Sequence, residues 1–188
     1  SIVHAQTDFS GLTAGWQQFT ATLTPATADP SARLVLSIAQ PGTVWLDVVS
    51  LMPHATYRNR SNGMRPDLAG ALAAMKPSFL RFPGGCYVEG NTLANAFRWK
   101  NSIGPISGRP GHWNLWGYTS TDGLGYHEYL QFCEDLGAAP VFCINAGISH
   151  SDVVPLDQMG EYVQDALDAI EYANGDAGTP WGAQRAAN

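Results

Sequence analysis

An arginine followed at once by a Pro-Gly-Gly turn is the strongest candidate for chemistry in this sequence. Arg81 lies near the end of an apolar segment, residues 78–82, and Pro83, Gly84 and Gly85 come next. Glycine permits positive φ and close approach of a ligand, proline fixes φ, and a guanidinium presents a planar fork of donors. At the C-terminal end of a parallel strand, these residues predict a ligand site. A tight strand-to-helix turn with Arg81 in a structural ion pair is the alternative that the local pattern leaves open.

A long aromatic segment follows this turn. Residues 90–121 show no clear helix or strand pattern, and their aromatic content argues against disorder. Broad amphipathic rings suit the face of a sugar as well as a protein core. We therefore consider Trp113, Trp116 and Tyr118 as a sugar platform, and packing of each ring onto the protein is a comparably good interpretation.

Composition excludes several classes of partner. The net charge is −6, with only ten Lys and Arg among 188 residues, so the basic stripe of a nucleic-acid-binding protein is absent. The sequence contains no window of about 20 apolar residues, so we expect no membrane partner. Cys86, Cys133 and Cys143 lack a C-x-x-C spacing, which argues against a zinc site and leaves one disulfide open. We expect no metal and no cofactor.

Two different patterns follow one another along the chain. Residues 16–23, 33–39 and 43–51 are short segments rich in alternating or β-branched residues, separated by prolines and a Pro-Gly pair. Segments of this length and spacing predict part of an antiparallel β-sandwich. They are too few to close one, so we expect either missing strands or an exposed edge that needs a partner.

After residue 53 the pattern alternates between helix and strand. We expect helices at residues 66–75, 125–136 and 156–173, and strands at residues 78–82 and 139–145. Asp122 is a candidate cap of the second helix, Gly137 ends it, and Met159, Val163 and Leu167 belong to the apolar stripe of the third. This alternation predicts an α/β fold, either a βα barrel or an open doubly wound sheet.

Several motifs in this sequence resemble those of a known protein family. From residue 57 to 185, the sequence resembles the α-L-arabinofuranosidases of glycoside hydrolase family 51, of the plant-like and fungal-like type. The matching motifs occur in the family's order: Asn-Gly-Met-Arg-Pro-Asp-Leu (62–68), Lys-Pro-Ser-Phe-Leu-Arg-Phe-Pro-Gly-Gly-Cys (76–86), Arg-Trp-Lys (98–100), Ile-Gly-Pro (103–105), Gly-Leu-Gly-Tyr-His-Glu-Tyr (123–129) and Glu-Asp-Leu-Gly-Ala (134–138).

The resemblance implies a fold and a division of the chain. Family members have a (β/α)₈ barrel, known as a TIM barrel, and an accessory β domain. We therefore expect residues 1–53 to be part of a β-sandwich that resembles a carbohydrate-binding module. Residues 54–188 are expected to be the N-terminal part of the barrel, which makes the fold α/β with a partial barrel.

The resemblance also implies which residues bind substrate. Arg81 matches the family's arginine near the nucleophile, and Cys86 stands where many relatives have an asparagine that contacts the sugar. Trp116 corresponds to an aromatic platform on the aglycone side, with Trp113 as the competing alignment. Asn145 ends a strand and is a further candidate for a hydrogen bond to substrate, although capping of the next loop is the slightly better interpretation.

The family's two catalytic glutamates are not found in this sequence. Retaining hydrolysis uses two carboxylates about 5 Å apart. Their motifs, including Gly-Asn-Glu, are absent from residues 1–188. Glu128 and Glu134 lie in a helical pattern, where surface or structural pairing is expected, and Glu89 is only a weak candidate near the site.

We therefore expect a fragment of a secreted, extracellular α-L-arabinofuranosidase that removes terminal arabinofuranosyl residues from arabinoxylan or arabinan. The isolated chain is expected to be inactive, and its two ends suggest that it was excised from a longer protein. Its partner would be an arabinose-containing polysaccharide or oligosaccharide. The alternative is a noncatalytic carbohydrate-binding module or sugar-binding fragment. We also expect self-association through exposed barrel edges.

Overall fold

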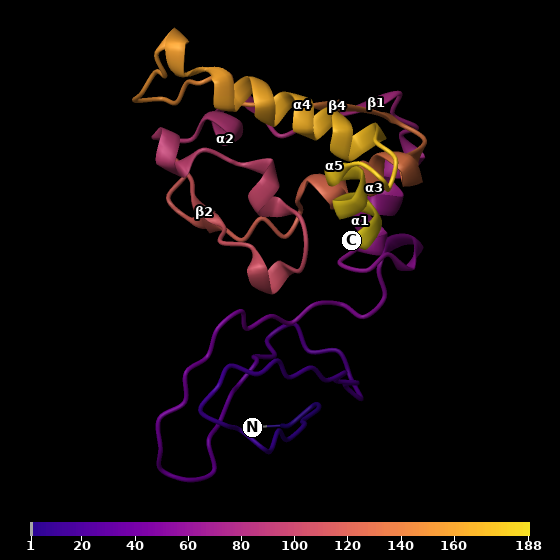
Figure 1. The fold of residues 1–188 in the computed structure, drawn as a ribbon. Helices are drawn as coiled ribbons and strands as arrows, with labels where there is room; N and C mark the ends of the chain where they lie inside the picture. The colour runs from indigo at the N-terminus through magenta and orange to yellow at the C-terminus, as the bar shows by residue number, and fades with distance from the viewer. Residues whose placement is uncertain (1) are drawn as a thin grey trace. The chain divides into compact units, whose positions relative to one another are not determined.

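The computed structural model describes residues 2–188 and divides into two compact units, Ser1–His54 and Ala55–Asn188 (Figure 1). None of the helices in the described residues is long and apolar enough to cross a membrane.

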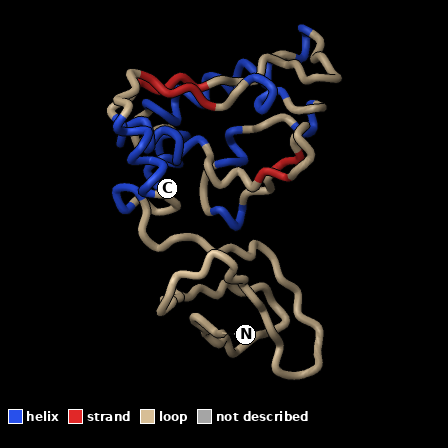
Figure 2. The backbone as a smooth tube through the Cα atoms, turned by 180° about the vertical axis from the view of Figure 1, so that it is seen from behind, coloured by secondary structure: helices blue, strands red, loops and turns tan. Residues whose placement is uncertain are grey.

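The first unit differs from the sequence prediction. Residues 2–54 contain no helix or strand, and they are drawn entirely as loop in Figure 2. The expected strands at residues 16–23, 33–39 and 43–51 are therefore not formed in this structure. Their large side chains are exposed, including Trp16 and Trp45 at 75% and 79%. A strand is stabilised by hydrogen bonds and packing from its neighbours, and these short segments have not paired with one another.

The second unit contains all the helices and strands of the described residues. In chain order they are α1 (Pro66–Ala74), β1 (Phe79–Phe82), α2 (Gly85–Glu89), β2 (His112–Trp113), β3 (Thr119–Ser120), α3 (Tyr126–Leu136), β4 (Ala139–Phe142), α4 (Gly160–Asn174) and α5 (Pro180–Ala187). Short 3₁₀ helices lie at Tyr57–Asn59, Leu93–Asn95, Trp99–Ser102, Ile106–Gly108 and Leu156–Gln158.

Strands β1 and β4 form a parallel pair, which runs side by side in Figure 2. Phe79 is opposite Ala139, and Phe82 is opposite Phe142. The chain returns between them through α3, as the predicted alternation of helix and strand requires. This confirms a mixed α/β fold, whereas closure into an eight-stranded barrel stays a prediction.

Helix α3 begins differently from the expectation. Asp122 does not cap it; instead Ser102 Oγ accepts a hydrogen bond from Tyr126 N at 3.0 Å, and Glu128 Oε2 accepts one from Gly125 N at 3.0 Å. Gly125 is required here because a Cβ atom would lie only 1.8 Å from the Ser102 carbonyl oxygen. Gly137 ends the helix with a φ of 67°, as predicted.

Aromatic rings form the core around β1, α3 and α4. Tyr129 and Tyr172 are fully buried, and Trp99 packs edge-on against Tyr126 and Trp181 at centroid distances of 5.2 and 5.0 Å. Helix α4 contributes Tyr172 and Ala169 to this core. Its predicted apolar stripe does not: Val163, Leu167 and Ile170 are more than half exposed.

Candidate active site

The Arg81 turn, which we define as residues 81–86, lies at the C-terminal end of β1. Arg81 is exposed and pairs in register with Val141 of β4. Gly84 has a φ of −77° and Gly85 begins α2, so neither glycine uses the positive φ that glycine permits. A Cβ atom on Gly84 would lie 3.9 Å from Arg81 Nη2, which is ordinary contact. The turn is therefore open beside the guanidinium.

Glu89 provides a negative charge on the other side of this turn. Its Oε1 would lie 3.9 Å from a Cβ atom on Gly85, and its Oε2 lies 3.6 Å from His150 Nε2. His150 N also donates a hydrogen bond to Gly90 O at 3.1 Å. A cation and an anion thus flank the Pro-Gly-Gly segment, and both are accessible to a polar ligand.

Cys86 is the second residue of α2 and is exposed with a free thiol. Cys133 is buried and Cys143 is partly buried, and neither forms a disulfide. Among residues 2–188, no group of three or more His, Cys, Asp or Glu side chains is arranged to hold a metal ion.

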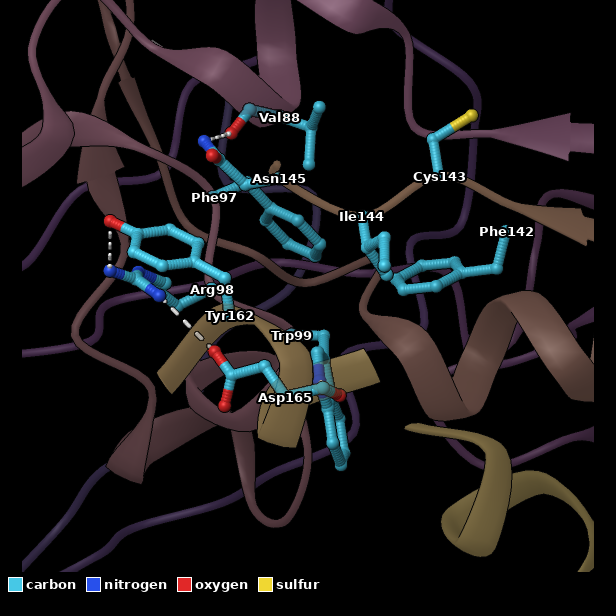
Figure 3. Close-up of a pocket in the computed structure, with 10 residues that line it drawn as sticks. All are labelled: Val88, Phe97, Arg98, Trp99, Phe142, Cys143, Ile144, Asn145, Tyr162 and Asp165. Atoms are coloured by element: carbon cyan, nitrogen blue, oxygen red, sulfur yellow. Dashed lines mark hydrogen bonds and ion pairs between the residues drawn. The ribbon is translucent and has the colours of Figure 1, made fainter. Parts of the chain in front are cut away.

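Asn145 holds the loop that follows β4. Its amide nitrogen donates to Val88 O at 2.9 Å and to Ile148 O at 3.0 Å. Its oxygen accepts from Gly147 N at 2.7 Å and Ile148 N at 3.1 Å. Figure 3 shows the amide directed at the Val88 carbonyl. All four hydrogen-bonding positions are used within the protein, so the geometry favours loop capping over a contact with substrate.

The cleft beside Asn145 is shallow and open to solvent, and its charged groups pair with one another (Figure 3). Arg98 Nη1 lies 3.1 Å from Asp165 Oδ2, and its guanidinium lies 4.7 Å from the centre of the Tyr162 ring. These contacts tie the aromatic segment to α4. The sequence motif Arg-Trp-Lys contains Arg98 but did not reveal its partners in α4.

The segment between α2 and α3 forms a short hairpin from β2 and β3, which pairs His112 with Ser120. We call residues 112–120 the aromatic hairpin. Asn114 orders its turn by accepting a hydrogen bond from Trp116 N at 3.0 Å and donating its own backbone N–H to Tyr118 O at 3.0 Å. Trp113, Trp116 and Tyr118 are about half exposed. Their rings are available for stacking on a sugar.

A buried ion pair fixes the residues on either side of the aromatic hairpin. Arg109 Nη2 lies 2.7 Å from Glu128 Oε1, and Arg109 also donates to the carbonyl oxygens of Gly104 and Asp122. Burial acts to raise the pKa of Glu128, but the hydrogen bonds from Arg109 and Asn62 outweigh it and hold the pKa below its ordinary value. This confirms the structural pairing expected for Glu128. Glu134 likewise contacts Arg60 at 3.2 Å.

A second buried cluster connects the hairpin to α2, and sequence reasoning did not find it. Asp122 lies at its centre and contacts Tyr87, His112 and Ser120. Burial is the main cause that raises the pKa of Tyr87 above its ordinary value, and the charge of Asp122 adds to it. The phenol therefore stays protonated and can donate a hydrogen bond.

Comparison with known proteins gives consistent matches. The sequence matches the alpha-L-arabinofuranosidase 1 domain over residues 71–188. It is 51% identical to alpha-L-arabinofuranosidase 1 of Arabidopsis thaliana over 159 residues, which is 84% of this chain and 23% of that protein. It is 39% identical to an extracellular exo-alpha-L-arabinofuranosidase of Streptomyces chartreusis, covering 92% of this chain and 22% of that protein. The chain thus spans about a quarter of the length of these relatives.

Solved structures of α-L-arabinofuranosidases are also similar to this chain. An arabinose-bound family 51 α-L-arabinofuranosidase is 45% identical and superposes with a TM-score of 0.67 over 70% of this chain and 21% of that chain. An arabinose complex of the Thermotoga maritima α-L-arabinofuranosidase is 31% identical, with a TM-score of 0.52 over 67% of this chain and 23% of that chain.

Proposed function

The chain belongs to the family 51 α-L-arabinofuranosidases, and from this membership we propose that it forms the N-terminal part of the catalytic barrel of a retaining enzyme. In this proposal, residues 54–188 supply one sector of the barrel and its arabinose-binding edge. Residues 1–53 belong to an accessory sandwich whose strands form only with further partner strands, because residues 2–53 form none by themselves in this structure. The enzyme removes terminal arabinofuranosyl residues from arabinoxylan or arabinan.

The position of Arg81 is the observation that carries the proposal. Its side chain is exposed on β1, which runs parallel to β4, and the open Gly84–Gly85 segment follows it. In parallel barrels, active sites are built at the C-terminal ends of the strands. A guanidinium at that edge can hold a carboxylate in its ionised form through two parallel hydrogen bonds. We therefore assign Arg81 the role of orienting the nucleophilic carboxylate.

The remaining residues of this edge contact the substrate. Cys86 directly follows the two glycines. It packs against the sugar ring, because a thiol is a small apolar group and a weak hydrogen-bond donor. Trp116 stacks on the leaving-group side, and Trp113 is the alternative for this role. Glu128 is not available as a catalytic acid, because its buried carboxylate is held by Arg109, and Glu134 lies in an exposed pair with Arg60.

We further propose that the enzyme works outside the cell. The Streptomyces relative is named as extracellular, and polymeric arabinosides are too large to be taken up intact.

A noncatalytic sugar-binding fragment is the second candidate. The exposed rings of Trp113 and Trp116 favour it, since exposed tryptophan faces bind sugars without catalysis. In this case the 188-residue chain alone would bind arabinoxylan, and affinity electrophoresis in a gel that contains the polymer measures that binding.

The deciding experiment compares the full-length protein with residues 1–188 alone. We expect the full-length protein to hydrolyse an aryl α-L-arabinofuranoside and to release arabinose whose first-formed anomer, followed by NMR, retains the α configuration. The 188-residue chain should not turn over, because retaining hydrolysis needs two carboxylates that it does not carry. A β anomer formed first, or turnover by the highly purified short chain, would contradict the proposal.

A further inference from the structure

We propose that Asp122 is a positioning residue that fixes the aromatic hairpin against the Arg81 turn and thereby sets recognition of the aglycone side of the substrate. The second half of this statement rests on the proposed function, in which a tryptophan of the hairpin contacts the leaving group. The first half concerns the protein alone and is tested separately.

The contacts of Asp122 join two elements that are distant in sequence. Tyr87 Oη lies 3.0 Å from Asp122 Oδ1 and 2.7 Å from Ser120 Oγ, and Ser120 Oγ donates to the same carboxylate at 3.1 Å. Tyr87 belongs to α2 and directly follows Cys86, whereas Ser120 lies in β3. One carboxylate therefore connects the helix of the Arg81 turn with the strand pair that holds Trp113 and Trp116.

His112, which lies in β2, is the third residue that contacts the Asp122 carboxylate. Its Nδ1 lies 3.0 and 3.1 Å from the two carboxylate oxygens of Asp122, and its ring packs edge-on against Tyr87 at a centroid distance of 4.9 Å. The side chains of His112 and Asp122 are only 7% and 2% exposed. Because the carboxylate accepts from Nδ1–H, the imidazole is held in one orientation.

Two observations argue that this cluster serves more than stability. Asp122 has a φ of 53°, in the left-handed region that non-glycine residues seldom adopt, and Arg109 Nη1 holds its carbonyl oxygen at 2.8 Å. In addition, His112 Nε2 is buried without a hydrogen-bond partner among the described residues. Both features cost free energy, and a cluster selected only for stability would avoid them.

The test uses Tyr87→Phe, which removes the phenol hydroxyl and keeps the ring. Tyr57→Phe is the matched control, because it makes the same change at a tyrosine of the Tyr57–Asn59 3₁₀ helix, outside both the aromatic hairpin and the Arg81 turn. Asp122→Asn is a second variant of nearly unchanged shape. All three are made in the full-length protein and measured by hydrogen–deuterium exchange. We expect Tyr87→Phe and Asp122→Asn to speed exchange in both residues 85–89 and residues 112–120, and Tyr57→Phe to speed exchange in neither segment.

The second readout is the ratio of KM for an arabino-oligosaccharide to KM for an aryl arabinofuranoside. Loss of one hydrogen bond is expected to raise this ratio about fivefold in Tyr87→Phe, with kcat on the aryl substrate unchanged. Faster exchange in only one of the two segments, or a KM ratio equal to that of the Tyr57→Phe control, would overturn the proposal. If the wild-type protein hydrolyses no arabinofuranoside, the proposed function fails, and the exchange measurement alone decides whether Asp122 couples the two elements.

Discussion

Arg109 and Glu128 form a buried, two-pronged ion pair, with Nη2 to Oε1 at 2.7 Å and Nη1 to Oε2 at 3.0 Å. Their side chains are 3% and 7% exposed. Arg109 lies before the aromatic hairpin, and Glu128 lies in the first turn of α3, so the pair fastens the long loop to the helix.

Removal of one partner is expected to destabilise the protein strongly. Glu128→Gln leaves the Arg109 guanidinium buried beside a neutral amide, which is expected to cost about 3–5 kcal/mol. Thermal denaturation of the full-length protein measures this loss. Glu134→Gln is the control, because its pair with Arg60 is largely exposed, and such pairs contribute about 0–1 kcal/mol. Equal effects of the two variants would contradict the role of the buried pair.

The same ion pair predicts that the free energy of unfolding decreases at acid pH. The pKa of Glu128 is below its ordinary value of 4.5 in the folded protein, so the unfolded chain takes up this proton first as the pH falls. Its stabilising contribution is therefore complete above about pH 5 and declines as the pH falls from 4.5 through the lowered folded pKa. Unfolding free energies measured between pH 6 and 3 should show a shallower decline in Glu128→Gln. A decline as steep as that of the wild type would mean that other carboxyl groups control acid unfolding.

The loop after β4 is expected to depend on the amide of Asn145. Asn145→Asp keeps both acceptors but loses the donors to Val88 O and Ile148 O, and should destabilise the protein by about 1–3 kcal/mol. Asn174→Asp is the matched control, because its single side-chain donor bond, to Ile170 O, is exposed. If Asn145→Asp left stability unchanged and weakened only sugar binding, the alternative interpretation of Asn145 as a substrate contact would be correct.

Residues 1–188 alone are predicted to self-associate or to be only marginally stable. Val163, Leu167 and Ile170 place an exposed apolar stripe on α4, and large exposed apolar patches drive association. Light scattering over micromolar concentrations should show association that Leu167→Lys reduces. Asp157→Asn changes the net charge by the same amount without touching the stripe and should have little effect. A stable monomer with a sharp cooperative melt would contradict this prediction.

The elements of residues 55–188 could be predicted because their signals are local. Pro66 and Gly137 mark a helix start and a helix end through backbone geometry that each residue imposes by itself. The α4 helix was found from its spacing, but its buried face was not. Tyr162, Ala169 and Tyr172 face the core, while the more apolar stripe is exposed. Periodicity locates a helix but does not identify its neighbours.

Only part of the candidate site could be predicted from the sequence, for a similar reason. The Arg81 turn is contiguous in sequence, so composition revealed it. Asp122 was interpreted as a helix cap, because Asp before a helix usually caps it. Its actual partners include Tyr87, which is 35 residues away, and local pattern carries no information about such a contact. The strands expected before residue 53 are likewise absent from the described structure, since pairing depends on partners that propensity does not specify.

Trp116→Ala in the full-length protein should mainly impair use of extended substrates. The ring is 56% exposed, and the loss of a stacking contact is expected to raise KM for an arabino-oligosaccharide up to about tenfold. Trp113→Ala is the necessary comparison, because Trp113 is the alternative platform and is 50% exposed. An equal loss on the small aryl substrate would place Trp116 away from the leaving-group side.

The central claim is that Arg81 orients a catalytic carboxylate at the end of β1, and the kinetics of Arg81→Lys in the full-length protein test it most directly. Lysine keeps the charge but cannot form two parallel hydrogen bonds. We predict that kcat/KM for an aryl α-L-arabinofuranoside falls about 100-fold or more, with unchanged thermal stability. Arg65→Lys, at an exposed arginine paired with Asp67, should have no effect. Near-normal kcat/KM in Arg81→Lys would contradict the account.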